Sequence, residues 1–126
     1  RYRKALGGEN EGGSRGFAQG NTQSFEEMAM GITGFVDFGG KSGDLKNPTE
    51  SLNYFNCHDN LIWEDKLQSS VDRKDLMVSM TKLAFGLLLT SQGLPFFHAG
   101  NEFRRTKKWM PTLIVPLIRS MPLIGH

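Results

Sequence analysis

The sequence predicts an α/β fold in which two parallel strands are joined by one helix. Two short apolar runs, residues 52–57 and 95–99, have the length and composition of buried strands. Between them, residues 72–91 carry apolar side chains at helical spacing. A strand, a helix and a second strand in this order form a parallel pair with a right-handed crossover. Because parallel sheets are usually covered on both faces, we expect this unit to need packing partners.

The first 21 residues are expected to form a loop. Eleven of the 15 glycines lie in residues 1–43, and six of them precede residue 21. Glycine adopts backbone angles that other residues avoid, and it offers no side chain to bury. We therefore expect no core in this part of the chain.

A short helix is predicted over residues 25–32. Ser24 and Glu27, three positions apart, have the form of a capping box at its start. The glycine-rich segment 39–43 contains a Lys-Ser pair but lacks the spacing of a phosphate-binding loop. We interpret that segment as a surface loop.

The segment 72–91 gives the strongest helix signal in the chain. Asp72 is the predicted N-cap, and Gly93 followed by Pro95 is the predicted stop. Spacings of three and four residues place its apolar side chains on one wide face, formed by Leu76, Met80, Leu83, Ala84, Leu87 and Leu88.

The ends of the two predicted strands are the candidate functional positions. In parallel α/β folds, ligands bind at the carboxyl ends of the strands. Here those ends are the polar strings CHDN at 57–60 and GNE at 100–102. A His-Asp pair by itself is most often a turn with a local hydrogen bond, so the pair alone does not indicate catalysis.

Other reactive side chains have simpler interpretations. We expect Cys57 to be a packed thiol rather than a nucleophile, because the sequence places no base for it. His98 lies within an apolar strand, which favours core packing over ligation. Glu102 is expected to make structural hydrogen bonds rather than act as a general acid. The basic run 104–108 is expected to be a solvated loop.

Composition excludes several classes of protein. The 126 residues allow one domain at most, and 15 basic against 13 acidic residues give a net charge of +2, too small to indicate nucleic-acid binding. No apolar run reaches about 18 residues, so we expect no membrane span. The single cysteine, Cys57, excludes a disulfide framework and a cysteine-based zinc site. It fits a reducing, cytoplasmic location, with a secreted parent as the alternative.

The first strand end resembles a family signature. The string LNYFNCHDN at 52–60 resembles the seventh-strand signature of α-amylase superfamily glycoside hydrolases. The chain also contains DKL at 65–67, LLTSQG at 88–93 and PFFHAG at 95–100, followed by EF at 102–103 and RTK at 105–107. With these strings in this order, it resembles type I pullulanases. Two departures occur, because IWE at 62–64 replaces the usual threonine-leucine-tryptophan, and Asn101 stands where an acid is common.

The resemblance implies an eight-stranded (β/α)8 TIM barrel, which needs about 250 residues. Residues 1–108 would then be part of the catalytic barrel, from the loop and helix after the sixth strand to the eighth strand. The family hydrolyses α-1,6-glucosidic linkages in pullulan, starch or glycogen by a retaining mechanism, with a nucleophile and an acid/base. The resemblance places these two carboxylates on strands before Arg1, so we expect the chain alone to be inactive.

The resemblance also assigns roles to the first strand end. Asp59 would stabilise the transition state by hydrogen bonds to the distorted sugar, and His58 and Asn60 would bind substrate. It implies an α-glucan partner and no organic cofactor. Calcium occurs in some relatives, but no metal site is predicted here. An isoamylase or glycogen-debranching enzyme is the alternative within this class, and a small non-enzymatic interaction protein with a basic, apolar tail is the alternative outside it.

The tail, residues 109–126, does not fit the resemblance. It contains no acid and three prolines, Pro111, Pro116 and Pro122, where the family would show a polar string. Codons read one base earlier can encode VDANSYSPADSINAIDW, which matches the expected string in order and spacing. We therefore interpret 109–126 as a frameshifted tail, with the shift near codons 106–109.

Overall fold

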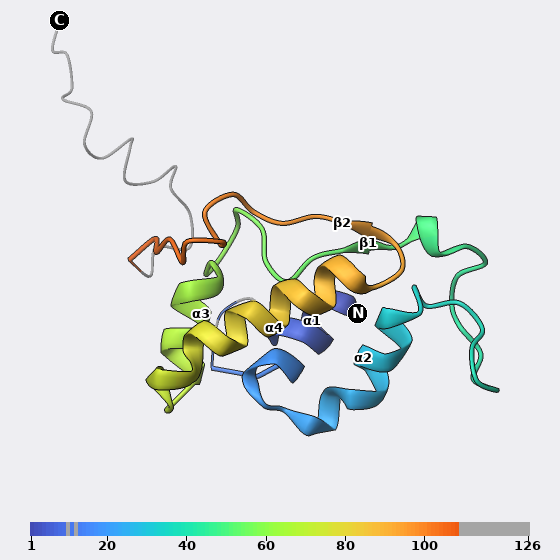
Figure 1. Ribbon diagram of the computed structural model, residues 1–126, viewed down its shortest axis with the longest axis horizontal. Helices are drawn as coiled ribbons and strands as arrows, with labels where there is room; N and C mark the ends of the chain where they lie inside the picture. Colours follow the sequence, from blue (N-terminus) through green and yellow to red (C-terminus); the bar gives the residue numbers. More distant parts are fainter. Residues whose placement is uncertain (10, 12, 109–126) are drawn as a thin grey trace, which may run out of the picture.

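The predicted parallel strand pair is present and lies along one edge of the molecule, with the helices on one side of it (Figure 1). A computed structural model of the chain describes residues 1–9, 11 and 13–108. Strand β1 (Leu52–Asn53) pairs with β2 (Leu94–Pro95), and Leu52 stands opposite Leu94. The α/β prediction is confirmed, but each strand has only two residues and is shorter than predicted. The last backbone hydrogen bond between the two segments runs from the Phe96 N–H to the Asn53 carbonyl, at 2.8 Å.

Helix α4 (Met77–Thr90) connects the two strands and lies along the sheet (Figure 1). It begins later than predicted, because a short 3-10 turn (Lys74–Leu76) precedes it. Asp72 does not cap it and instead forms an ion pair with Arg15, at 2.7 Å. At the other end, Gly93 adopts a φ of 115°, which an L side chain would strain, so the predicted stop at this glycine is confirmed.

The predicted apolar face of α4 is only partly buried. Leu83 and Leu76 are 43% and 38% exposed. The predicted face is therefore partly confirmed, because Ala84 and Leu88 are fully buried and Met80 and Leu87 pack against the core. The helix is apolar over most of its circumference, so spacing alone does not select the whole side that packs. A threonine enters the core because its hydroxyl accepts a hydrogen bond from the Trp63 indole N–H, at 3.0 Å. The buried residues of the helix are Met77, Thr81, Ala84 and Leu88.

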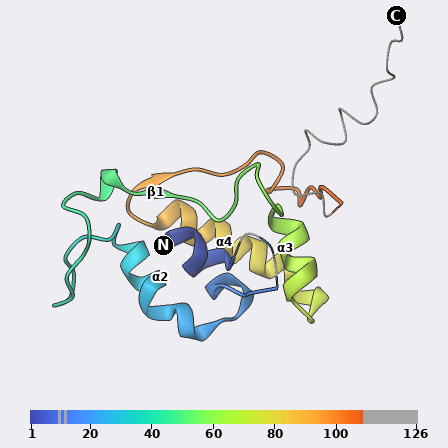
Figure 2. The same ribbon diagram turned by 180° about the vertical axis from the view of Figure 1, so that it is seen from behind.

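The prediction that residues 1–21 form a loop without a core is wrong. Helix α1 (Tyr2–Gly7) lies there, and Leu6 is fully buried. The two views show α1 beside α4, between that helix and α2 (Figures 1 and 2). A Cβ atom at Gly16 would lie 2.5 Å from the backbone nitrogens of Gly7 and Gly8. The glycines therefore allow close packing of backbone on backbone, which glycine content alone does not reveal.

Helix α2 (Phe25–Ile32) has the predicted bounds. Its predicted capping box is wrong, because in the described part of the chain the Ser24 side chain makes no capping hydrogen bond. The Asn21 side chain instead accepts a hydrogen bond from the Gln23 N–H, at 3.1 Å, and so caps the 3-10 turn that leads into the helix. The segment 39–43 is a mostly exposed turn, as predicted.

Helix α3 (Trp63–Ser70) is an element that the sequence did not predict. Trp63 and Leu67 are fully buried, and the Trp63 ring meets Phe55 edge-on with 5.0 Å between the ring centroids. Three charged residues in the first half of the helix, Glu64, Asp65 and Lys66, are also buried. A helix that buries charges shows no separation of polar and apolar faces, so periodicity does not detect it.

Within the described ranges, no helix is both long and apolar enough to cross a bilayer. The remaining structural prediction concerns the tail. Residues 109–126, and with them the frameshift interpretation, lie outside the described residues.

Candidate functional site

The two strand ends meet, as predicted from the parallel topology. The Asn101 side-chain N–H donates to the Asn56 side-chain oxygen at 2.6 Å, and each residue is 2% exposed. This buried amide pair joins the segment after β1 to the segment after β2. Asn101 thus supplies a neutral donor that fits its neutral partner.

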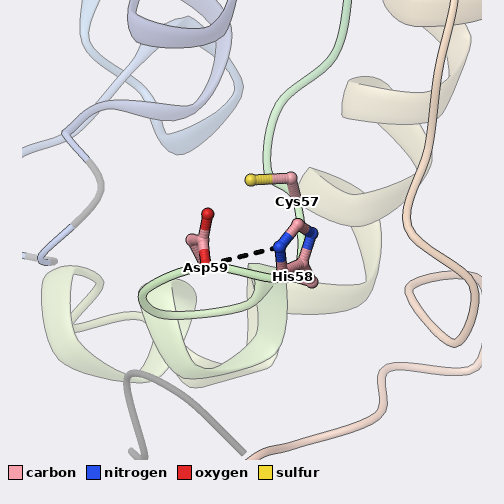
Figure 3. A group of neighbouring side chains, drawn as sticks. All are labelled: Cys57, His58 and Asp59. Atoms are coloured by element: carbon pink, nitrogen blue, oxygen red, sulfur yellow. Dashed lines mark ion pairs between the residues drawn. The ribbon is translucent and has the colours of Figure 1, made fainter. Parts of the chain in front are cut away.

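His58 and Asp59 project from the end of the first strand segment into solvent (Figure 3). Their side chains are 78% and 67% exposed, and His58 Nε2 lies 3.4 Å from Asp59 Oδ1. Asn60 follows with a φ of 59°, a left-handed conformation that turns the chain back. An imidazole and a carboxylate are therefore presented together, with the polar Asn60 half-buried beside them.

The buried Lys107 side chain fixes the turn at residues 58–60. Its ammonium donates to the His58 carbonyl at 2.6 Å and to the Asn60 carbonyl at 2.9 Å, one on each side of Asp59. Its backbone N–H donates to the Asp65 carboxylate at 3.0 Å. Burial lowers the pKa of Lys107, and the nearby Asp59 carboxylate opposes that effect. The backbone around Asp59 is thus fixed by a cation from a distant part of the sequence.

The segment that carries Lys107 is tied to helix α3, so the prediction of a solvated loop over 104–108 is wrong. The Arg104 guanidinium donates to both carboxylate oxygens of Glu64, at 2.8 and 2.9 Å, and the Glu64 side chain is 8% exposed. The Thr106 hydroxyl donates to Asp65. Since bidentate, partly buried pairs of this kind are directional, they fix the position of the segment.

His98 and Glu102 lie beside the second strand end. His98 is half-buried, and its Nε2 lies 3.1 Å from Arg105 Nη2, so the prediction of plain core packing is only partly correct. Burial lowers the pKa of His98, and Arg105 adds to this effect. The Glu102 carboxylate accepts a hydrogen bond from the Gly100 N–H at 2.8 Å, which agrees with the predicted structural role.

Lys66 is the most unusual side chain near the site, and sequence patterns do not predict its burial. Its ammonium is fully buried and lies 3.4 Å from the carbonyl oxygens of Gly8 and Phe55. Burial lowers its pKa to about 7, and the like charge of Arg3 contributes. Lys66 thus links the end of α1, the segment after β1 and helix α3, in the interior near the exposed His58–Asp59 pair. A lysine among polar residues looks like a surface residue in sequence.

A hollow elsewhere on the surface is a weaker candidate for the functional site than the strand ends. It is lined by residues of the loop 36–48, among them Asp37 and Asp44. It contains no residue of the strand ends, and its walls belong to a single loop. We therefore place the site at His58, Asp59 and Asn60, where exposed polar groups stand on a buried, hydrogen-bonded base.

The arrangement is suited to binding hydroxyl groups. An ionised carboxylate accepts hydrogen bonds from hydroxyls, an imidazole can donate or accept, and the Asn60 amide can do both. Charge-assisted bonds of this kind are about twice as strong as neutral ones. Across the described residues, one group of three potential metal ligands is present, formed by Cys57, His58 and Asp59.

Comparison with known proteins gives consistent results in sequence and structure. No protein-family model matches the chain. A pullulanase of Bacillus subtilis (strain 168) is 35% identical over 95 residues, which is 74% of this chain. The apo pullulanase structure from Paenibacillus barengoltzii matches 87% of this chain, with a TM-score of 0.80 and 34% identity. The type I pullulanase structure of Bacillus subtilis str. 168, complexed with maltose, matches 88%, with a TM-score of 0.81 and 32% identity.

The matches cover a small part of each relative. The chain spans 13% of the curated Bacillus subtilis pullulanase and 18% and 16% of the two solved chains. At more than 30% identity over most of this chain, the likeness extends beyond the fold to the sequence.

Proposed function

Because the chain is similar in sequence and fold to a segment of pullulanases, we propose that it forms part of the catalytic (β/α)8 barrel of a pullulanase-type debranching enzyme. Residues 1–108 would supply the last part of the barrel, up to the eighth strand, and β1 and β2 would be its seventh and eighth strands. The parallel register of these strands and the helix between them support this assignment.

The proposed reaction is hydrolysis of α-1,6-glucosidic linkages in pullulan, starch or glycogen with retention of configuration. Asp59 stabilises the oxocarbenium-like transition state by accepting hydrogen bonds from sugar hydroxyls, and these bonds strengthen as positive charge develops on the ring. His58 and Asn60 bind the same sugar. The observation that carries the proposal is the exposed His58–Asp59 pair, held by Lys107 at the carboxyl end of a parallel strand.

Catalysis also needs groups beyond this strand end. A retaining glycosidase uses a nucleophile and an acid/base, about 5–5.5 Å apart, and we propose that both lie outside residues 1–108. We therefore propose that the chain alone does not hydrolyse pullulan. The maltose in the Bacillus subtilis structure supports an α-glucan as ligand of the complete enzyme. The reducing, cytoplasmic location is likewise proposed, on the single cysteine alone.

A chimera tests the function directly. Residues 51–108 would replace the matching segment of the Bacillus subtilis pullulanase, and release of maltotriose from pullulan would be measured. We expect an active chimera and a loss of kcat of at least about a hundredfold in Asp59→Asn, the scale seen when a group that stabilises developing charge is removed. Asp75→Asn is the control, because Asp75 is an exposed carboxylate paired with Arg73.

A chimera that unfolds cooperatively but retains full activity as Asp59→Asn would overturn the proposal, because this carboxylate would then not act on the substrate. The products distinguish the alternative within the class, because pullulanases release maltotriose from pullulan and isoamylases scarcely attack it. A folded, active chimera that favours glycogen over pullulan would support the isoamylase alternative.

A further inference from the structure

We propose that Cys57, His58 and Asp59 form a binding site for a thiophilic divalent cation such as Zn²⁺. The sequence predicted no metal site, because zinc sites built mainly from cysteines need several of them. The structure instead brings together three different donors, a thiol, an imidazole and a carboxylate, whose ligand atoms all lie within 4.8 Å of one another. Figure 3 shows the thiol and the imidazole directed toward the Asp59 carboxylate.

The distances suit a tetrahedral ion. With Zn–N and Zn–O bonds of about 2.0–2.2 Å, the nitrogen and oxygen ligands of a tetrahedral site lie about 3.4 Å apart. His58 Nε2 and Asp59 Oδ1 are 3.4 Å apart, so one edge of the tetrahedron is already formed. A zinc thiolate bond of about 2.3 Å requires the sulfur about 3.6 Å from the other two ligands. Rotation of exposed side chains can supply that adjustment.

The donor set selects the class of cation. A thiolate favours zinc, cobalt and cadmium over calcium and magnesium, which take oxygen ligands. The thiolate and the Asp59 carboxylate together carry two negative charges, which match a divalent ion. On binding, the thiol proton passes to solvent, and sulfur, nitrogen and oxygen replace three water ligands of the ion. A fourth position remains for water.

The site stands on a fixed base, which lowers the cost of ordering it. Lys107 holds the carbonyls of His58 and Asn60, so the backbone that carries the donors is already positioned. His58 and Asp59 are mostly exposed, and Cys57 is half-buried, so an ion reaches all three from solvent. The proposal does not depend on the debranching function and can be tested on the chain alone.

Cobalt gives a direct test, because Cys57 is the only cysteine in the chain. The 126-residue chain, kept reduced, would be titrated with Co²⁺ while the near-ultraviolet thiolate-to-cobalt charge-transfer band is recorded. We expect saturation at one ion per chain and displacement by Zn²⁺. Cys57→Ser should abolish the band, and His58→Gln and Asp59→Asn should each weaken the apparent affinity at least about tenfold.

Controls distinguish this site from adventitious binding. His98→Gln and His126→Gln remove the other two histidines, and both variants should bind Co²⁺ as the unmodified chain does. The exposed side chains of His58 and Asp59 allow their substitution without loss of fold, which circular dichroism checks. Absence of the band, or a band that persists unchanged in both His58→Gln and Asp59→Asn, would overturn the proposal.

Discussion

The buried ammonium of Lys66 makes a quantitative prediction about the pH dependence of stability. Its pKa falls from the usual 10.5 to about 7 in the folded chain, mainly through burial. At 1.36 kcal/mol for each pH unit, this difference corresponds to about 5 kcal/mol between fully protonated and fully deprotonated conditions. Because the unfolded chain binds the proton more tightly, the free energy of unfolding rises as pH increases from about 7 towards 10.5.

The measurable part of this effect lies between about pH 7 and 9. Over that interval the two pKa values give an increase of about 2 kcal/mol in the free energy of unfolding. Tyr2 does not interfere, because burial raises its pKa above the usual 10.0. Lys66→Met removes the titrating group, so the difference in stability between the unmodified chain and this variant should change by about 2 kcal/mol across the interval.

Urea unfolding followed by Trp63 fluorescence measures the stability of the region around α3, with Trp109→Phe as background to remove the second tryptophan. Lys82→Met is the matched control, because Lys82 is exposed on α4, and it should leave the pH dependence unchanged. Carbon-13 NMR of labelled lysines gives the pKa directly. A Lys66 resonance that titrates near 10.5, or equal pH slopes in the unmodified chain and Lys66→Met, would refute the reasoning.

Further substitutions test the packing of the fold and the hydrogen bonds that support the site. Asn101→Leu leaves the buried Asn56 oxygen without its donor and should lower the free energy of unfolding by about 1–3 kcal/mol; an unchanged urea midpoint would contradict this. Gly16→Ala should destabilise the chain, because its Cβ would meet backbone at 2.5 Å, whereas Gly86→Ala meets open space and should stabilise α4 by about 1 kcal/mol. Lys107→Met should accelerate amide exchange in the turn around Asp59 at least about tenfold, while Lys108→Met should not; equal exchange in both would show that Lys107 does not hold the turn.

Local patterns predicted the elements that carry a recognisable start or stop signal, a recurring apolar spacing or a short apolar run. The start signal before residue 25 and the apolar spacing in residues 72–91 predicted two helices, and the apolar runs predicted two strand positions and their parallel order. The strand ends followed from topology, since carboxyl ends of parallel strands lie at one edge. These predictions succeed because each depends on neighbours within a few positions in the sequence.

The rest depends on contacts between distant residues. Helix α3 buries Lys66 and Asp65, whose partners come from α1 and from the segment around Lys107, so its own sequence resembles an exposed segment. At the end of helix α1, Gly7 and Gly8 pack their backbone against Gly16. Glycine content alone does not predict that contact. The Lys107 clamp joins positions 47 and 49 residues apart, a separation at which a single sequence carries no pairing signal.

The exposed face of the strand pair bears on the proposed barrel. Leu52 and Leu94 are opposite one another in the register, so both side chains lie on one face, and they are 57% and 53% exposed. Asn53, next along β1, is fully buried and donates to the Gln92 carbonyl at 2.7 Å. A parallel sheet in a β/α barrel has helices on its outer face and a packed interior of branched apolar side chains on the other. Leucines at these two positions fit the interior face of such a barrel, so the uncovered pair supports the proposal that further strands lie beside β1 and β2.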